Sequence, residues 1–274
     1  MSEKKNAGKA RKSAPRHSVD ISEEAGVRYL HFGSDWVQGA MRIARPWSLE
    51  LDYTREMMAG LLLRDDPQWP RSALLIGLGA GSLAKFIYRN LPQCRSTVVE
   101  INPQVDYIAR QYFKLPDDPA RLAVVIGDGA DYMMAGGRSF DYILVDGFDA
   151  DARAGALVTL PFYQACRSRL SESGLLCVNL LGRNKGFAAS VARLQEAFAG
   201  RCLVFPPCPS GNTIAFASGG APVATTLDAM QEKASRLKQA TRLDTLPTLK
   251  RLRHEGGLDA QQNGEPAPGG ILKI

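Results

Sequence analysis

A glycine-rich loop and an acidic residue beyond it carry the first groups that could bind a ligand. An apolar run at residues 73–76 ends in Gly77, Gly79 and Gly81, and a helical pattern follows. Glycines let a backbone come close to a ligand, and the free N–H groups of a helix N-terminus favour anionic or polar atoms. A second apolar run closes with Glu100, where a carboxylate can accept hydrogen bonds from both hydroxyls of a ribose. Together these groups predict a site for an adenosine-containing cofactor.

Two later apolar runs also end in glycine or acid. One leads into Asp128-Gly129, and the other leads into Asp146 and, three positions on, Asp149. In an open α/β sheet, ligands bind outside the carboxyl ends of the strands, so these run ends predict one shared site. Each motif taken singly also fits a structural role. The glycines could form a tight turn without a ligand, and Asp146 could cap the turn that follows it.

The net charge of the chain lies mostly in its first residues. Of the formal charge of +6, residues 1–17 supply +5, because they hold six Lys or Arg against one acid. We expect this stretch to be a disordered basic tail, and the nearly neutral remainder offers no basic face for a nucleic acid. The 274 residues, 45% of them hydrophobic and 23% charged, fit one large soluble domain, with or without a small appendage.

The cysteine and hydrophobic patterns indicate the cellular compartment in which the protein is expected. The five cysteines are scattered, without a C-x-x-C pair or a histidine cluster, which argues against a disulfide framework or a zinc site. No stretch has the length of a membrane span, and the N-terminus lacks the apolar core of a signal peptide. We therefore expect a cytoplasmic protein with no metal and no membrane partner.

Two periodicities divide the rest of the chain. Residues 18–51 are predicted to form a small β-rich segment with a hairpin, and helical spacing over residues 52–63 opens the main domain at residues 52–220. Residues 221–253 are predicted to form one or two polar helices, and residues 254–274 a disordered tail. In the main domain, strands are expected near residues 73–77, 96–100, 122–126, 141–145 and 174–179, and helices near residues 81–91, 103–113, 129–135, 159–171 and 186–198.

The end of the main domain distinguishes between two α/β folds. Residues 201–205 and 212–217 are β-prone, and the Pro- and Gly-rich connection between them indicates a hairpin instead of a helical crossover. Five parallel strands closed by an antiparallel hairpin differ from the dinucleotide-binding fold. The expected fold is therefore α/β, with a doubly wound, seven-stranded, mostly parallel sheet of the methyltransferase-like Rossmann type, preceded by the small N-terminal β segment.

From about Ser48 to Gly219 the chain resembles the polyamine aminopropyltransferases, the spermidine synthase family. The family's motifs occur in the family's order, as Tyr53-Thr54-Arg55-Glu56-Met57, the loop from Gly77 to Gly81, Glu100, Asp128-Gly129 and Asp146-x-x-Asp149. The resemblance implies a transferase of polyamine biosynthesis, with decarboxylated S-adenosylmethionine as donor and a small-molecule amine as acceptor. It places Glu100 on the donor's ribose and Asp128 near its adenine amino group. It also implies a homodimer.

The same resemblance assigns the acceptor side of the site. It implies that Asp146 orients or deprotonates the attacking amine, and that Asp149 and Tyr53 line the acceptor side with it. This chemistry is consistent, because only a neutral amine can attack the carbon beside the donor's sulfonium, and a carboxylate can accept the proton. Asp149 could bind a second ammonium or the same one.

Three positions depart from the family's pattern. Ala80 stands where the family carries an aspartate that binds the amine of the aminopropyl group, and a methyl group offers an ammonium no hydrogen bond. Thr54 stands where an aromatic residue is expected, with Tyr53 one place earlier, and Asn179 stands where an acid often follows the fifth strand. A groove with so few acids would attract a polyamine weakly. S-adenosylmethionine itself is therefore a second candidate donor.

Three other functions stay open on the sequence alone. A methyltransferase acting on an unknown small molecule would keep the nucleoside contacts and lose the donor-specific contact at Ala80. A nucleoside-binding protein without catalysis would have no need of Asp146 and Asp149. A nicotinamide-dependent oxidoreductase is opposed by Ser82, which stands where a dinucleotide fingerprint has its third glycine, and by the terminal hairpin. Fold-level analogy cannot choose between methyl transfer and aminopropyl transfer.

Overall fold

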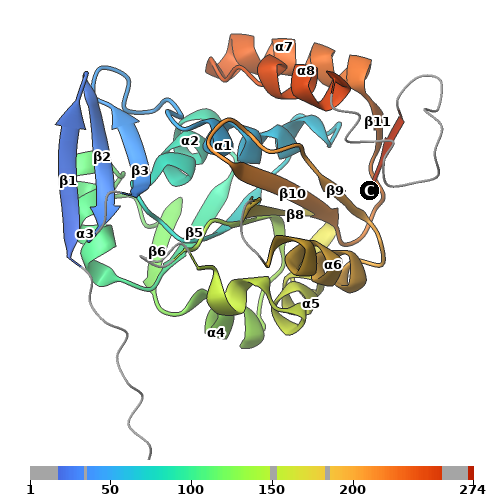
Figure 1. The fold of residues 1–274 in the computed structure, drawn as a ribbon, viewed down its shortest axis with the longest axis horizontal. Coiled ribbons are helices and arrows are strands. Elements are labelled where there is room, and N and C mark those ends of the chain that lie inside the picture. Colours follow the sequence, from blue (N-terminus) through green and yellow to red (C-terminus); the bar gives the residue numbers. More distant parts are fainter. Residues whose placement is uncertain (1–17, 34–35, 149–152, 183–185, 255–270) are drawn as a thin grey trace, which may run out of the picture.

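A central seven-stranded sheet forms the middle layer of the protein (Figure 1). The computed structural model describes residues 18–33, 36–148, 153–182, 186–254 and 271–274. The strands lie in the order β6-β5-β4-β7-β8-β10-β9; β10 is antiparallel to β8 and β9, and the other neighbours are parallel. This confirms the predicted doubly wound sheet and its closing hairpin. The strands are β4 (Ser72–Ile76), β5 (Arg95–Glu100), β6 (Leu122–Ile126), β7 (Phe140–Val145), β8 (Leu170–Leu181), β9 (Cys202–Val204) and β10 (Asn212–Ser218).

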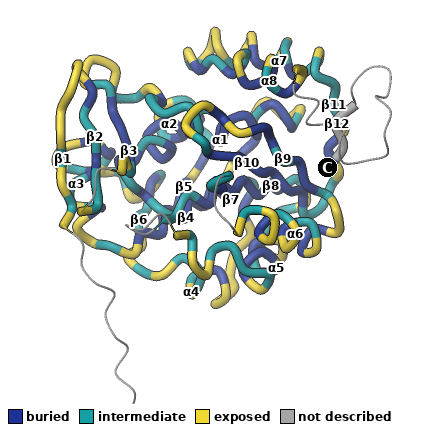
Figure 2. The backbone as a smooth tube through the Cα atoms, viewed as in Figure 1, coloured by how far each residue is buried: buried dark blue, intermediate teal, exposed yellow. Residues whose placement is uncertain are grey.

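Alternate residues of the central strands pack into two helical layers, and the buried positions run through the middle of the molecule (Figure 2). In β4, Ala73 and Leu75 belong to the cluster on one face, whereas Leu74 and Ile76 belong to the cluster on the other. The first cluster includes residues of α1 (Asp52–Met57), the 3-10 helix η1 (Met58–Leu62), α2 (Ser82–Asn90) and α3 (Pro103–Phe113). The second includes residues of α4 (Gly129–Met134), α5 (Leu160–Ser168) and α6 (Phe187–Ala197); a short 3-10 helix, η2 (Gly155–Val158), precedes α5.

The N-terminal segment is a three-stranded antiparallel sheet, one strand more than the predicted hairpin. It consists of β1 (Val19–Glu24), β2 (Val27–Phe32) and β3 (Val37–Arg42), and β1 pairs along its whole length with β2. The additional strand is mostly exposed. Its apolar residues, Val19 and Ile21, alternate with polar ones and are partly buried, but two such positions are too few to identify a strand from the sequence. On its inner side the sheet packs Leu30 and Met41 against Ala80 of the glycine loop, which ties this sheet to the main domain.

The C-terminal part contains the two predicted helices, α7 (Leu227–Thr241) and α8 (Leu246–His254), which lie over α1 (Figure 1). The last residues differ from the expected disordered tail. β12 (Ile271–Lys273) pairs antiparallel with β11 (Ala224–Thr226), and Ile274 is buried. Sequence patterns could not place so short a strand, because its partner lies about 45 residues away and its register is set by the tertiary fold. The expected tails at residues 1–17 and 255–270 lie outside the described residues.

Candidate functional site

A cavity of about 1150 Å³ lies at the carboxyl ends of the central parallel strands. It brings together most of the residues that the sequence singled out, namely Tyr53, Gly77, Gly79, Glu100, Asp128, Gly129 and Asp146. Gly81 does not line the cavity; it is the N-cap of α2, with a left-handed φ of 68°. Asp149 lies outside the described residues. The four strand ends therefore meet at one cavity, and the ligand-binding and catalytic roles of these residues stay predictions.

The glycine loop brings two strand ends into contact. Gly77 has a φ of 97°, and a Cβ built on it would lie 2.2 Å from the carbonyl oxygen of Asp146. No side chain fits there, because such a distance is well inside van der Waals contact and the backbone conformation favours glycine. Gly77 thus allows β4 and β7 to end side by side, and the glycine loop lies next to Asp146, the predicted catalytic residue.

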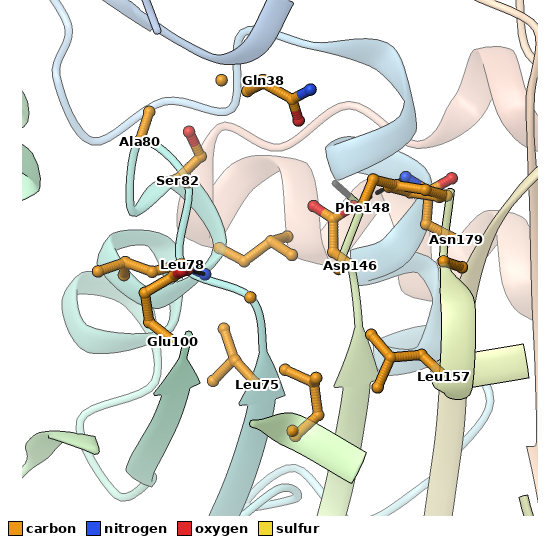
Figure 3. A pocket seen from close by; sticks show the side chains of 18 of the residues that line it. Gln38, Leu75, Leu78, Ala80, Ser82, Glu100, Asp146, Phe148, Leu157 and Asn179 are labelled. Atoms are coloured by element: carbon orange, nitrogen blue, oxygen red, sulfur yellow. Dashed lines mark hydrogen bonds between the residues drawn. The ribbon is translucent and has the colours of Figure 1, made fainter. Parts of the chain in front are cut away.

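Glu100 is buried beneath the loop and holds it in place (Figure 3). One carboxylate oxygen accepts a hydrogen bond from the backbone N–H of Leu78, and the other accepts one from the backbone N–H of Asn102, both at 2.9 Å. Burial raises the pKa of Glu100, while these backbone hydrogen bonds oppose the shift. Each carboxylate oxygen has a further lone pair that could accept a ribose hydroxyl. The carboxylate therefore fits a nucleoside while also fixing the loop.

Asp128 caps the helix that follows it. Its Oδ1 accepts hydrogen bonds from the backbone N–H groups of Ala130 at 2.7 Å and Asp131 at 3.1 Å, at the start of α4. The sequence analysis did not assign this N-cap role to Asp128. The same side chain lines the cavity beside Gly129. A contact with the adenine amino group stays a prediction.

Asp146 meets two side chains at the wall of the cavity. Its Oδ1 accepts a hydrogen bond from Nδ2 of Asn179 at 2.8 Å, and Tyr53 of α1 lies beside the same carboxylate. Burial raises the pKa of Asp146, and Asn179 and Tyr53 oppose the shift. In the described part of the chain, no Lys or Arg is among the groups that shift this pKa. Tyr53 thus brings an aromatic hydroxyl to the site from one position before the place where the family carries its aromatic residue.

Two polar residues behind Asp146 were missed by the sequence analysis. Oδ1 of Asn179 accepts a hydrogen bond from Nδ2 of Asn212 at 3.0 Å, and Oδ1 of Asn212 accepts one from the Ser210 hydroxyl at 2.8 Å. This chain of donors sets the Asn179 amide so that its NH₂ points at Asp146. Ser210 lies in the Pro- and Gly-rich hairpin connection, and Asn212 is the first residue of the strand that follows it. No motif marks either residue as functional.

Ala80, the main departure from the family's pattern, is packed against the N-terminal sheet. A Cβ on Gly39 of β3 would lie 2.6 Å from the Cβ of Ala80, and Ala80 is 2% exposed. The loop and the strand therefore touch backbone to backbone at this point. The Ser82 hydroxyl adds a hydrogen bond to the carbonyl of Ala40 at 3.1 Å. A side chain at position 39 would push β3 away from the loop, whereas Ala80 also lines the cavity.

Within the described ranges, no three or more His, Cys, Asp or Glu side chains gather in a way that could hold a metal ion. The helices in those ranges also lack the length and apolar character needed to cross a membrane.

Several known proteins resemble the chain in sequence or in fold. The spermine/spermidine synthase domain matches residues 51–184. A polyamine aminopropyltransferase of Neisseria meningitidis is 40% identical over 226 residues, which cover 82% of this chain and 85% of the relative. Human methyltransferase-like protein 13, solved in complex with SAH, has a TM-score of 0.62 and 27% identity, covering 70% of this chain and 93% of that one.

A spermidine synthase solved in complex with the transition state analogue AdoDATO has a TM-score of 0.57 and 25% identity, covering 74% of each chain. The similarity to the Neisseria relative extends over most of both proteins, and the domain match contains the glycine loop, Glu100 and Asp146. The chain therefore belongs to the spermine/spermidine synthase family and is a transferase with a methyltransferase-like fold.

Proposed function

We propose that this protein transfers the aminopropyl group of decarboxylated S-adenosylmethionine to an amine acceptor, a reaction of polyamine biosynthesis. The observation that carries the proposal is the placement of Asp146 in the same cavity as Glu100 and the glycine loop. A buried carboxylate suits an ammonium ligand, because a nearby positive charge stabilises its ionised form. The Neisseria relative and the solved spermidine synthase support the same reaction by their names.

The donor half of the cavity fits a nucleoside. Glu100 has lone pairs available for the two ribose hydroxyls, and the loop at Gly77 and Gly79 lets the backbone come close to the donor. Asp128 and Gly129 line the cavity next to this position and are assigned to the adenine. When bound, the donor supplies a carbon activated by the adjacent sulfonium.

The acceptor half supplies a proton acceptor and a means of orienting the amine. The amine nitrogen, once neutral, forms a bond to the activated carbon while the carbon–sulfur bond breaks, and the electron pair of that bond stays on sulfur. Asp146 accepts the amine's proton, directly or through water, and Tyr53 and Asn179 fix its carboxylate. Asp149 is assigned to the acceptor side as well, although it lies outside the described residues.

A second candidate, methyl transfer from S-adenosylmethionine, is favoured by one observation. The loop position that would recognise the aminopropyl amine is Ala80, which lines the cavity and whose methyl group offers an ammonium no hydrogen bond. The solved human methyltransferase-like protein 13, which resembles this chain, was crystallised with SAH. The nucleoside contacts described above would serve either donor equally.

A mass-spectrometric transfer assay decides between the two reactions. The purified protein is incubated with each donor and a panel of monoamines, diamines and triamines, and the products are identified by mass. Aminopropylated amines from the decarboxylated donor are expected. Methylated amines from S-adenosylmethionine, with no product from the decarboxylated donor, would establish the second candidate. A protein that binds both donors and transfers neither group would contradict both proposals.

Two expectations about the protein's setting stay proposals. A cytoplasmic location is supported by the five cysteines, which are all free and buried, as suits a reducing compartment. A homodimer is implied by the family resemblance alone.

A further inference from the structure

The segment that carries Tyr53 is short and depends on its neighbours for its position. α1 has six residues and continues as the 3-10 helix η1, so the whole segment runs from Asp52 to Leu62. A helix of this length is not stable by itself in water. Its placement therefore comes from tertiary contacts, and these contacts determine where the Tyr53 hydroxyl lies relative to Asp146.

The central sheet supplies one set of these contacts. The Tyr142 hydroxyl of β7 donates a hydrogen bond to the carbonyl of Met57, and Sγ of Cys177 in β8 lies 3.7 Å from the same oxygen. Both contacts fix the C-terminal end of α1. The N-terminal end of α1, which bears Tyr53, has no side-chain cap.

The C-terminal helices supply a second set. Lys233 of α7 donates hydrogen bonds to the carbonyls of Leu62 at 3.1 Å and Arg64 at 3.4 Å, and forms an ion pair with Asp65 at 2.6 Å. Lys233 thus binds the far end of the segment, after η1. A helix pair that sequence analysis marked only as polar therefore packs on the segment that bears a site residue.

The central contact is a buried ion pair between α8 and α1. Arg251 donates to Oε1 of Glu56, and the Glu56 side chain is 2% exposed. Glu56 follows Tyr53 by three positions, so the two side chains are neighbours on the surface of α1. Burial raises the pKa of Glu56 to about 7, and Arg251 opposes that shift. Within the described residues, Oε2 of Glu56 and Nε of Arg251 have no hydrogen-bond partner.

Such a pair is an inefficient way to gain stability. The cost of removing two charges from water can exceed their attraction, and well-packed apolar residues often hold a structure as well or better. A hydrogen bond between two charged groups does, however, fix the orientation of the two side chains relative to each other, which apolar packing does not. The pair joins residues 195 positions apart and links the C-terminal appendage to the helix that enters the active cavity.

The geometry points to Arg251 as a positioning residue, which acts through Glu56 to hold α1 so that the Tyr53 hydroxyl engages Asp146. Arg251 itself is not a lining residue of the cavity. On this account the C-terminal helices α7 and α8 are part of the acceptor side of the site, although they contribute no group to it. The inference rests on the proposed function only for its kinetic consequence.

The test compares Arg251→Met with Arg253→Met, a matched control two residues along α8. Arg253 pairs with Asp228 at 2.7 Å on the surface, and its side chain is 51% exposed. Hydrogen exchange by mass spectrometry is expected to be faster over residues 52–62 in Arg251→Met, and unchanged over the glycine loop at residues 77–82. Arg253→Met should exchange like the natural protein in both segments. Equal exchange over residues 52–62 in both variants would overturn the inference.

A double-mutant cycle with Tyr53→Phe supplies the kinetic readout. Arg251→Met is expected to lower turnover roughly tenfold, within the range for coupled neighbouring residues, while leaving donor affinity unchanged. In the Tyr53→Phe background the same substitution should have almost no effect, because the hydroxyl that it positions is gone. An equal loss of turnover in both backgrounds would show a merely structural role and overturn the inference.

Arg251→Lys keeps the positive charge and provides a milder variant if Arg251→Met does not fold. It should recover most of the turnover and most of the protection of residues 52–62, and a lysine variant that exchanges as fast as an unfolded segment would contradict the account. The exchange measurement needs no substrate. If the natural protein transferred no group, the proposed function would fail while the exchange pattern would still decide this inference.

Discussion

The carboxylate of Glu100 accepts a hydrogen bond from the backbone N–H of Leu78 at 2.9 Å, so the acid predicted to bind the ribose also holds the glycine loop. A strand-tip acid would be expected from the sequence to matter little for folding. The structure gives it a second role, because Glu100 is 6% exposed and satisfies two backbone N–H groups. The position of the loop therefore depends on the same side chain that is predicted to bind the donor.

Glu100→Ala should weaken both the donor site and the fold. The affinity for S-adenosyl nucleosides should fall by about 1.5–3 kcal/mol, the scale for hydrogen bonds to a charged group. The free energy of unfolding should fall by about 1–3 kcal/mol, because the N–H of Leu78 loses its acceptor. Calorimetric titration and chemical denaturation measure the two effects. Glu24→Ala, at an exposed strand end, is the control, and a Glu100 variant that matches it in both measurements would contradict the assignment.

Gly39→Ala should destabilise the protein. A Cβ there would lie 2.6 Å from the Cβ of Ala80, and overpacking of this kind costs about 1–3 kcal/mol. Gly127→Ala is the control, since a Cβ there would meet nothing within 4 Å. Thermal denaturation compares the two variants, and a Gly39→Ala variant as stable as the control would show that β3 can move away from the glycine loop.

Asn179→Leu should move the acidic limb of the pH–activity profile to higher pH. The Asn179 hydrogen bond lowers the pKa of Asp146 against the effect of burial, so its loss leaves that pKa higher still. Because Asp146 must be ionised to accept a proton, activity should then require a higher pH. The pH dependence of turnover at saturating donor tests this. A limb that stays in place, or moves to lower pH, would mean that Asp146 is not the titrating group.

Lys85 should make stability depend on pH in the alkaline range. It is buried in α2, its Nζ donates to the carbonyl of Phe113 at 2.7 Å, and burial lowers its pKa to about 7. Between that value and the ordinary lysine pKa, the unfolded chain binds more protons than the folded one. The free energy of unfolding should therefore rise as the pH increases through this window, by at most about 1.4 kcal/mol per pH unit.

Lys85→Met should flatten this rise, and the exposed Lys250→Met should leave it unchanged. Urea denaturation at several pH values above 7 measures the slope in each variant. An equally steep slope in the natural protein and in Lys85→Met would assign the effect to another group.

The sequence predicted those parts of the site that follow from local pattern. Apolar runs end at Gly77, Glu100, Asp128 and Asp146, and the common direction of parallel strands brings such ends together. The same reasoning gave the sheet and its closing hairpin, because helical and strand periods differ clearly in this chain. It did not give β12, whose partner strand lies far away in the sequence and whose own three residues carry no pattern.

Contacts between distant segments could not be predicted from the sequence. Asn212 reaches Asn179 only because β10 pairs with β8, and Arg251 reaches Glu56 only because α8 packs over α1. Neither pair has a spacing that a single sequence reveals. The contact between Ala80 and Gly39 likewise depends on how the N-terminal sheet packs on the loop. The missed residues are therefore those whose role is tertiary.

Asp146→Asn tests the central claim most directly. The variant keeps the shape of the side chain and cannot take up the proton of the amine, so turnover should fall by about 10²–10⁴, the usual cost of losing a general base. Donor affinity, measured by calorimetry on the same preparation, should change little, because the ribose is predicted to bind at Glu100 and not at Asp146. Asp141→Asn, in the same strand and away from the cavity, serves as the control. Full turnover in Asp146→Asn with the acceptor found by the transfer assay would contradict the proposed mechanism and leave methyl transfer, where positioning alone can suffice.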